Sequence, residues 1–219
     1  GRSVSMTLYQ YDHRSRYTRN RSVDSAATGG RSGVGTINVQ GDGMFIREMR
    51  LDDLPFVMRV QRCCYHAIVP ESQAVMESKL TIGPGCCFVC EENNLIVGYL
   101  LGHPWRSNSV IALHMELKEL PPECDCLYLH DMAVLPEMRG KKIGEQLLYK
   151  FETEALRRKI RYVFLVAVQG AETFWLRMGY YKKNNADTIK LSSYGTPAFS
   201  MMKVLAPYPD EECTSLPVS

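Results

Sequence analysis

The sequence lacks the features that would place it outside ordinary globular proteins. It has no apolar run of the roughly 18 residues needed to cross a bilayer, and its first residues lack the apolar core of a secretory signal. Its 26 basic and 24 acidic residues leave a net charge of only +2, without the basic excess that is typical of nucleic-acid binding. We therefore expect an intracellular, cytoplasmic protein with no membrane or nucleic-acid partner.

The eight cysteines do not follow a disulfide or metal pattern. Four of them form the adjacent pairs 63–64 and 86–87 within apolar stretches, which is typical of buried free thiols. A zinc site would have to join Cys87-x-x-Cys90 to Cys124-x-Cys126, and the second spacing is unusual for structural zinc. The sequence therefore predicts free thiols and no metal.

The composition changes twice along the chain. Residues 1–43 combine arginine, serine and glycine with few aliphatic side chains, which predicts a flexible tail and also resembles an organelle transit peptide. Residues 44–205 have the periodic apolar pattern of a folded domain, and residues 206–219 read as a solvated acidic tail. A chain of 219 residues favours one domain with tails over two complete domains.

Within residues 44–205 predicted strands and helices are mixed, so we expect an α/β or α+β fold. About seven strands are predicted, at 44–50, 86–92, 95–105, 126–134, 161–168, 180–183 and 197–205. About four helices are predicted, at 51–66, 71–80, 142–159 and 171–178.

Residues 127–148, LYLHDMAVLPEMRGKKIGEQLL, join a strand to the best-defined helix through a basic turn. At a helix start several backbone N–H groups lack partners and the dipole is positive, so a phosphate can bind where side chains leave room. Gly140 and Gly144 leave that room, and Arg139, Lys141 and Lys142 add countercharge suited to a pyrophosphate. The turn is a candidate phosphate site, with simple helix capping as the alternative.

In element order and motifs, residues 44–205 resemble the GNAT acetyltransferases. The segment VLPEMRGKKIG (134–144) resembles the superfamily's acyl-CoA motif, and AETFWLRMGY (171–180) resembles the motif that follows it. The resemblance implies a mixed, mostly antiparallel sheet splayed between its fourth and fifth strands, with acetyl-CoA in the gap. Backbone groups of residues 132–134 would pair with the pantetheine arm, and the amides of 139–144 would hold the pyrophosphate. The implied cofactor-binding residues are Met132, Ala133, Val134, Arg139, Gly140, Lys141, Lys142, Ile143, Gly144 and Trp175.

Three positions depart from the family pattern. The usual R-x-x-G-x-G would place glycine at Lys142, whose Cβ narrows the approach of a phosphate to the backbone. The asparagine common after the fifth strand is Val168 here. The tyrosine that protonates the departing thiolate in many members is Trp175, and an indole N–H cannot serve as that acid. The general acid is therefore unassigned.

Acetyl transfer needs a neutral amine, and a primary amine with a pKa of about 10.4 is almost wholly protonated at pH 7. Because side chains alternate along a strand, Tyr128, His130 and Met132 are expected on one side and Leu129 and Asp131 on the other. His130 is the predicted base, since its ordinary pKa suits proton transfer near neutrality. The alternative is a structural histidine.

In the predicted scheme the amine attacks the thioester directly. His130 takes the amine's proton through one or two waters, and the N–H of Val134 stabilises the oxyanion. A ping-pong route through cysteine is disfavoured, because no cysteine has a partnering histidine at a motif position.

Within the superfamily the sequence is most similar to arylalkylamine N-acetyltransferases, which have histidines at the positions of Tyr128 and His130. Their third-strand region is also similar to FVCEENNLIVGYLLGHPW (88–105). The implied acceptor is a small primary amine. The expected acceptor-binding residues, which are often core residues instead, are Tyr65, His66, His103 and Trp105.

Two other functions stay open on the sequence alone. One is acetylation of a protein, at a lysine or at the N-terminus, and the other is a non-catalytic acyl-CoA sensor, which the change at Trp175 suggests. Residues 192–194 are read as a polar loop that could supply a replacement acid. Arg177 and Lys182 are read as solvent-facing charges, with contact to the adenosine phosphates as the alternative. Acyl-chain length and oligomeric state are not indicated.

Overall fold

The computed structural model describes residues 37–38, 43–65, 69–183, 188–195 and 197–206. Its strands are β1 (Ile37–Asn38), β2 (Met44–Glu48), β3 (Phe88–Glu92), β4 (Leu95–Trp105), β5 (Cys126–Val134), β6 (Tyr162–Ala167), β7 (Tyr181–Lys182) and β8 (Phe199–Val204). Its α-helices are α1 (Leu54–Cys64), α2 (Gln73–Ile82), α3 (Ile143–Arg157), α4 (Glu172–Arg177) and α5 (Thr188–Ser192). Short 3-10 helices are η1 (Leu51–Asp53) and η2 (Pro136–Met138).

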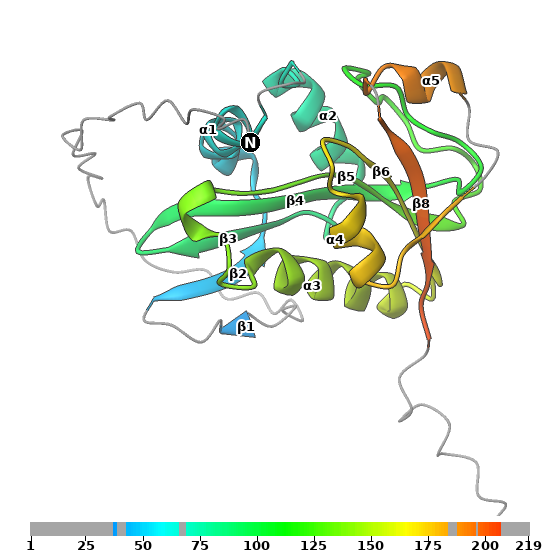
Figure 1. Ribbon diagram of the computed structural model, residues 1–219. Coiled ribbons are helices and arrows are strands. Elements are labelled where there is room, and N and C mark those ends of the chain that lie inside the picture. The colour runs from blue at the N-terminus through cyan, green and yellow to red at the C-terminus, as the bar shows by residue number, and fades with distance from the viewer. Residues whose placement is uncertain (1–36, 39–42, 66–68, 184–187, 196, 207–219) are drawn as a thin grey trace, which may run out of the picture. The chain divides into compact units, whose positions relative to one another are not determined.

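In the described residues the strands form one eight-stranded sheet in the order β1-β2-β3-β4-β5-β6-β8-β7 (Figure 1). Neighbouring strands are antiparallel except β5 and β6, which are parallel. The helices α1 and α2 lie on one face of the sheet, and α3 with α4 lies on the other (Figure 1). The predicted mixed sheet is confirmed, with β1 as an additional short strand.

The parallel strands β5 and β6 pair along only part of their length. Residues 126–129 of β5 are in register with residues 162–165 of β6, and the described pairing goes no further. Beyond that point β5 continues to Val134 in register with β4 alone. The sheet is therefore splayed between the strands predicted as fourth and fifth, and one edge of β5 faces a gap.

A β-bulge lies at the start of this gap. Leu101 is in register with Asp131 and Gly102 with Leu129, so His130 has no partner on β4. An extra residue in one strand re-aims the side chains around it. His130 and Asp131 accordingly both contact groups from the α1–α2 side of the sheet, Glu71 and Tyr65 respectively. The expected strict alternation is wrong here, because the sequence shows no sign of the bulge.

Local sequence explains the helix ends. The Oγ of Ser72 accepts a hydrogen bond from the backbone N–H of Val75 at 3.3 Å, which caps α2, and the helix ends at Gly83 as predicted. The polar loop predicted at 192–194 is wrong, because α5 occupies part of it and Tyr194 is buried, donating to the carbonyl of Ile111 at 2.7 Å. Among the described helices, none has the length and apolar character required to span a membrane.

Candidate active site

Two cavities open on the gap beside β5. Cavity A, of about 340 Å³, is lined by the end of α1, residues 69–71, β5 and the turn after β6. Cavity B, of about 390 Å³, is lined by the end of β5, η2 and the start of α3. The residues that line both cavities are Met132, Ala133, Val134, Arg139 and Phe174. The cavities therefore meet along the free edge of β5.

The backbone groups along the free edge of β5 point alternately toward β4 and toward the gap. The backbone N–H of Leu135 donates to the carbonyl of Val97 at 2.9 Å. Because hydrogen-bonded pairs alternate along an antiparallel ladder, the backbone of Ala133 faces β4, whereas that of Met132 and Val134 faces the gap. An extended amide-bearing ligand can pair with such an edge. By this alternation the backbone of Ala133 is directed toward β4, whereas the resemblance placed it among the pantetheine contacts.

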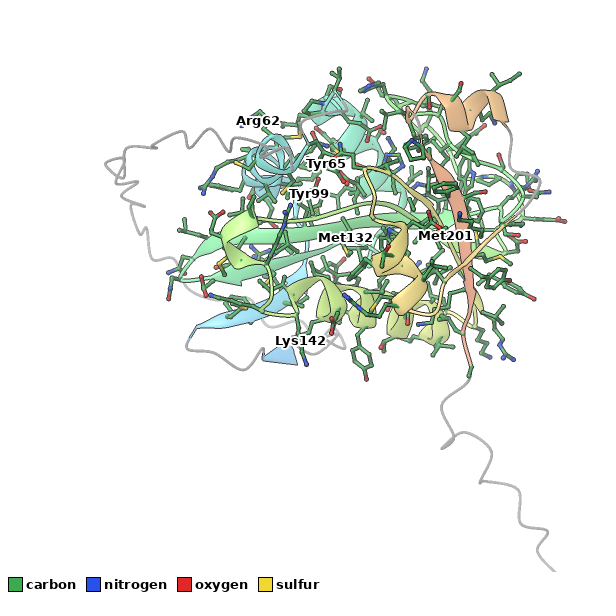
Figure 2. The ribbon with its side chains drawn as sticks, viewed as in Figure 1. Arg62, Tyr65, Tyr99, Met132, Lys142 and Met201 are labelled. Carbon is green, nitrogen blue, oxygen red and sulfur yellow. The ribbon has the colours of Figure 1, made fainter. Side chains whose placement is uncertain are left out.

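Cavity B ends at the N-terminus of α3 (Figure 2, Lys142). Within the described residues the backbone amides of 140–145 donate no hydrogen bond. Gly140 has φ +84°, and a Cβ built on it would meet no atom within 4 Å. Lys142 has φ +59°, a left-handed conformation that costs a non-glycine residue about 1–2 kcal/mol. Unpaired amides at the positive end of a 15-residue helix form a site suited to an anion.

Most of the predicted cofactor residues line cavity B, with Lys141 and Trp175 as exceptions. The ammonium of Lys141 bonds Glu92 at 3.1 Å instead. Trp175 lines cavity A and packs edge-on against Phe174 in the core. Arg177, for which solvent exposure was preferred over contact with the adenosine phosphates, lines cavity B and adds a positive charge there.

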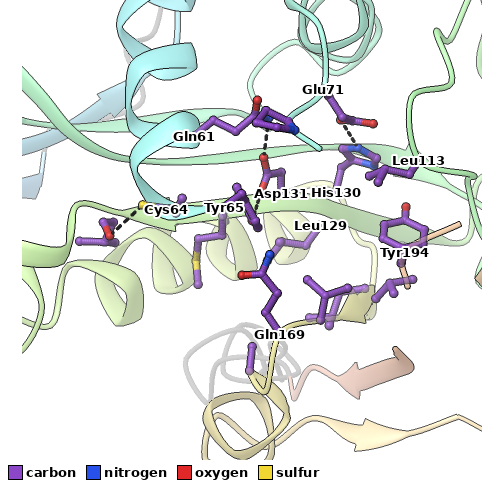
Figure 3. Close-up of a pocket in the computed structure, with 18 of the residues that line it drawn as sticks. Gln61, Cys64, Tyr65, Glu71, Leu113, Leu129, His130, Asp131, Gln169 and Tyr194 are labelled. Carbon is purple, nitrogen blue, oxygen red and sulfur yellow. Dashed lines mark hydrogen bonds and ion pairs between the residues drawn. The ribbon is translucent and has the colours of Figure 1, made fainter. Parts of the chain in front are cut away.

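One wall of cavity A contains a buried charge network centred on Glu71 (Figure 3). The carboxylate lies 2.7 Å from His130 Nε2 and 3.2 Å from Lys79 Nζ, and accepts the backbone N–H of His114 at 2.8 Å. Burial alone raises the pKa of Glu71, but His130 and Lys79 outweigh it and bring the value down to about 2. Burial lowers the pKa of Lys79. The network keeps Glu71 ionised and fixes His130.

Asp131 lies beside this network and is held differently (Figure 3). Its carboxylate accepts hydrogen bonds from the hydroxyl of Tyr65, from the hydroxyl of Tyr99 at 2.5 Å and from Gln61 Nε2 at 3.4 Å. All three donors are neutral, and none of the described cations forms an ion pair with it. Burial raises the pKa of Asp131. The cavity thus contains a carboxylate whose charge no cation balances.

The structure does not bring the other aromatic candidates to either cavity. His103 stacks on Tyr128 with ring centroids 5.7 Å apart, and Trp105 contacts His103 edge-on at 5.5 Å. These residues lie where β5 still pairs with a strand on each side, so their side chains enter the core. His66 lies outside the described residues. Of the described members of the expected acceptor set, Tyr65 lines cavity A.

Residues 54–180 match the family model described as Acetyltransferase (GNAT) family. The chain belongs to this family. The acetyltransferase is also similar in fold to Ard1 from Thermoplasma volcanium, at 15% identity over 75% of this chain and 99% of that chain, with a TM-score of 0.57. It is also similar in fold to the ribosomal-protein-S18-alanine N-acetyltransferase from Escherichia coli, at 17% identity over 77% of this chain and 97% of that chain, with a TM-score of 0.55.

A third solved structure of similar fold contains coenzyme A. The PaiA N-acetyltransferase from Thermoplasma acidophilum, in complex with coenzyme A, is 16% identical over 74% of this chain and 99% of that chain, with a TM-score of 0.54. No curated protein matches the sequence. Family membership and fold together identify an acetyl-CoA-dependent acetyltransferase, and the acceptor is left to be proposed.

The sequence did not indicate Glu71, Lys79 or Asp131 as site residues of the acetyltransferase. Glu71 lies 59 positions before His130, so no local pattern joins them. Asp131 was placed on the opposite face by strict alternation. The available signal was a carboxylate within the otherwise apolar strand LYLHDMAV, since a buried charge needs a reason.

Proposed function

We propose that the acetyltransferase transfers acetyl from acetyl-CoA to a primary amine by direct attack, with both substrates bound together. The observation that carries the proposal is the junction of cavities A and B along Met132–Val134. The pyrophosphate lies at the amides of 140–145, and the pantetheine pairs with the backbone of Met132 and Val134. The amine enters through cavity A and reaches the thioester at the junction, where the N–H of Val134 stabilises the oxyanion.

The acceptor in this proposal is a small amine, and the arylalkylamines are the class we put first. A cavity of about 340 Å³ is of the size that holds small organic ligands. Its walls include Tyr65, Trp175 and Tyr194, which offer apolar ring surface, and Asp131, which attracts an ammonium group.

His130 acts in this proposal as the base that converts the bound ammonium into an amine. Its side chain is only 1% exposed and Nε2 is bonded to Glu71. Nδ1 has no hydrogen-bond partner within the described residues. Nδ1 is therefore the ring atom that would accept the proton, and the proposal keeps the relay of one or two waters between it and the amine.

The test is thiol release from acetyl-CoA with arylalkylamines, polyamines, amino acids and short peptides. We expect turnover on small primary amines and a loss of about 100-fold or more in His130→Ala. Arg139→Glu should raise the KM for acetyl-CoA without changing the order of preferred amines. Preference for peptides would support protein acetylation instead, and acetyl-CoA binding without turnover on any acceptor would support a sensor.

A further inference from the structure

A tyrosine and an aspartate meet where cavity A reaches the free edge of β5. The hydroxyl of Tyr65, at the end of α1, donates to Asp131 Oδ1, and both residues line the cavity (Figure 3). Tyr99, on β4, donates to the other oxygen of Asp131 at 2.5 Å but is fully buried and lines neither cavity. The two phenols share one carboxylate and differ in their access to ligand.

We propose that Asp131 and Tyr65 carry a proton from the attacking nitrogen to the departing sulfur. The proposal rests on the proposed function and supplies the acid that Trp175 cannot provide. Asp131 immediately precedes Met132, whose backbone faces the pantetheine path, so the pair is close to the thioester in the bound complex. Both residues are catalytic in this scheme, because they touch the reacting groups.

The step balances without an external donor. The neutral amine forms a bond to the carbonyl carbon, its nitrogen becomes positively charged, and one N–H proton passes to the free lone pair of Asp131. As the C–S bond breaks with its electron pair on sulfur, the Tyr65 hydroxyl gives its proton to the thiolate. Asp131 then returns its proton to the Tyr65 oxygen. The pair ends as it began, and one hydrogen has moved from nitrogen to sulfur.

The surroundings of the pair favour a linked transfer. Burial raises the pKa of Asp131, which makes it a better proton acceptor, and burial with the Asp131 charge raises the pKa of Tyr65. Tyr65 therefore releases a proton readily only while its partner supplies another. The titratable groups that act on the pair are Tyr99, Cys64, Glu71 and His130, with Lys79 acting on Asp131 from behind Glu71.

The other hydroxyl and thiol groups described in cavity A lack a carboxylate partner. The hydroxyl of Tyr194 donates to the carbonyl of Ile111 at 2.7 Å, and the thiol of Cys64 donates to the carbonyl of Val134 at 3.3 Å. A main-chain carbonyl cannot return a proton to the group that bonds it. Among the hydroxyl and thiol groups described in this cavity, Tyr65 is the one that donates to a carboxylate. His130 also bonds a carboxylate, that of Glu71, but serves in the proposed function as the base.

The experiment compares Tyr65→Phe with Tyr99→Phe, each of which removes one hydroxyl from Asp131. We expect Tyr65→Phe to lower kcat about 100-fold, with the KM for acetyl-CoA changed little and the solvent deuterium isotope effect on kcat altered. Tyr99→Phe should change kcat by no more than several-fold. Asp131→Asn should match Tyr65→Phe, and the double variant should be no slower than either, because the two act as one unit.

Unfolding curves and acetyl-CoA binding of each variant separate loss of chemistry from loss of fold. Equal losses of kcat in Tyr65→Phe and Tyr99→Phe, or multiplicative losses in the double variant, would overturn the proton path while leaving the proposed function intact. A wild-type protein that binds acetyl-CoA but acetylates no amine would instead overturn the proposed function, and with it the path.

Discussion

At the scale of single residues, Glu71 joins three separate parts of the chain. Its carboxylate binds His130 on β5, Lys79 on α2 and the backbone N–H of His114 in the connection between β4 and β5. A buried charge that loses its partner is strongly destabilising, by about 3–5 kcal/mol. The residue therefore contributes to the fold as well as to the wall of cavity A.

The lowered pKa of Glu71 predicts a pH dependence of stability. The group titrates near its ordinary value of 4.5 when unfolded and at about 2 when folded, so its contribution is complete above about 4.5. The contribution, roughly 3 kcal/mol, disappears as the pH falls from about 4.5 to about 2. Urea unfolding between pH 7 and pH 3 should show a shallower acid slope in Glu71→Gln than in wild type. Glu77→Gln, at an exposed position on the adjacent helix α2, is the control, and equal slopes in both variants would contradict the prediction.

At this scale the sequence predicted the lining of cavity B better than the lining of cavity A. Arg139, Gly140 and Gly144 belong to one contiguous turn, so their proximity needs no tertiary information. Glu71 and Tyr65 reach β5 from a distant part of the chain, and only the folded sheet brings them there. Residues that act through long-range contacts leave no spacing in the sequence.

At the scale of elements, β4 and α3 approach closely beside the bulge. A Cβ at Gly102 would lie 2.6 Å from Phe151 Cζ and 3.0 Å from the carbonyl of Tyr128. Glycine is therefore required sterically at this position. The extra residue of the bulge is His130 on β5, so Gly102 on β4 is needed for the close approach and not for the bulge itself.

Gly102→Ala is expected to lower the free energy of unfolding by about 1–3 kcal/mol, because the added methyl overpacks the contact with Phe151. Adding Phe151→Leu should restore part of the loss, since the smaller side chain makes room. Gly144→Ala serves as a control, because its Cβ would meet no atom closer than 3.7 Å. Chemical unfolding measures all three, and wild-type stability in Gly102→Ala would refute the argument.

The elements themselves were largely predictable, whereas their irregularities were not. The helix α3 and the strand β5 follow from apolar periodicity, which reflects burial on one face. The bulge at His130 arises from a mismatch between two paired strands, and α5 is a helix of only five residues. Neither leaves a periodic signal within its own residues.

At the scale of the whole molecule, the gap beside β5 couples ligand binding to stability. A ligand that binds only the folded state stabilises it by about 2.7 kcal/mol at 100 times its Kd. We expect the Tm to rise steadily with acetyl-CoA concentration in a thermal-shift titration. Arg139→Glu should need much more ligand for the same rise, and a Tm indifferent to acetyl-CoA would contradict cofactor binding in cavity B.

The splayed sheet affects the resistance of the protein to proteolysis. With the gap empty, the edge of β5 and the amides before α3 depend on water for their hydrogen bonds, and the two halves of the sheet are joined there by a short parallel pairing. In the proposed complex, coenzyme bound in the gap would bridge those two halves and stabilise the folded sheet. Chains made while acetyl-CoA is scarce should therefore open and be digested by proteases sooner, so the abundance of the enzyme follows the supply of its own co-substrate.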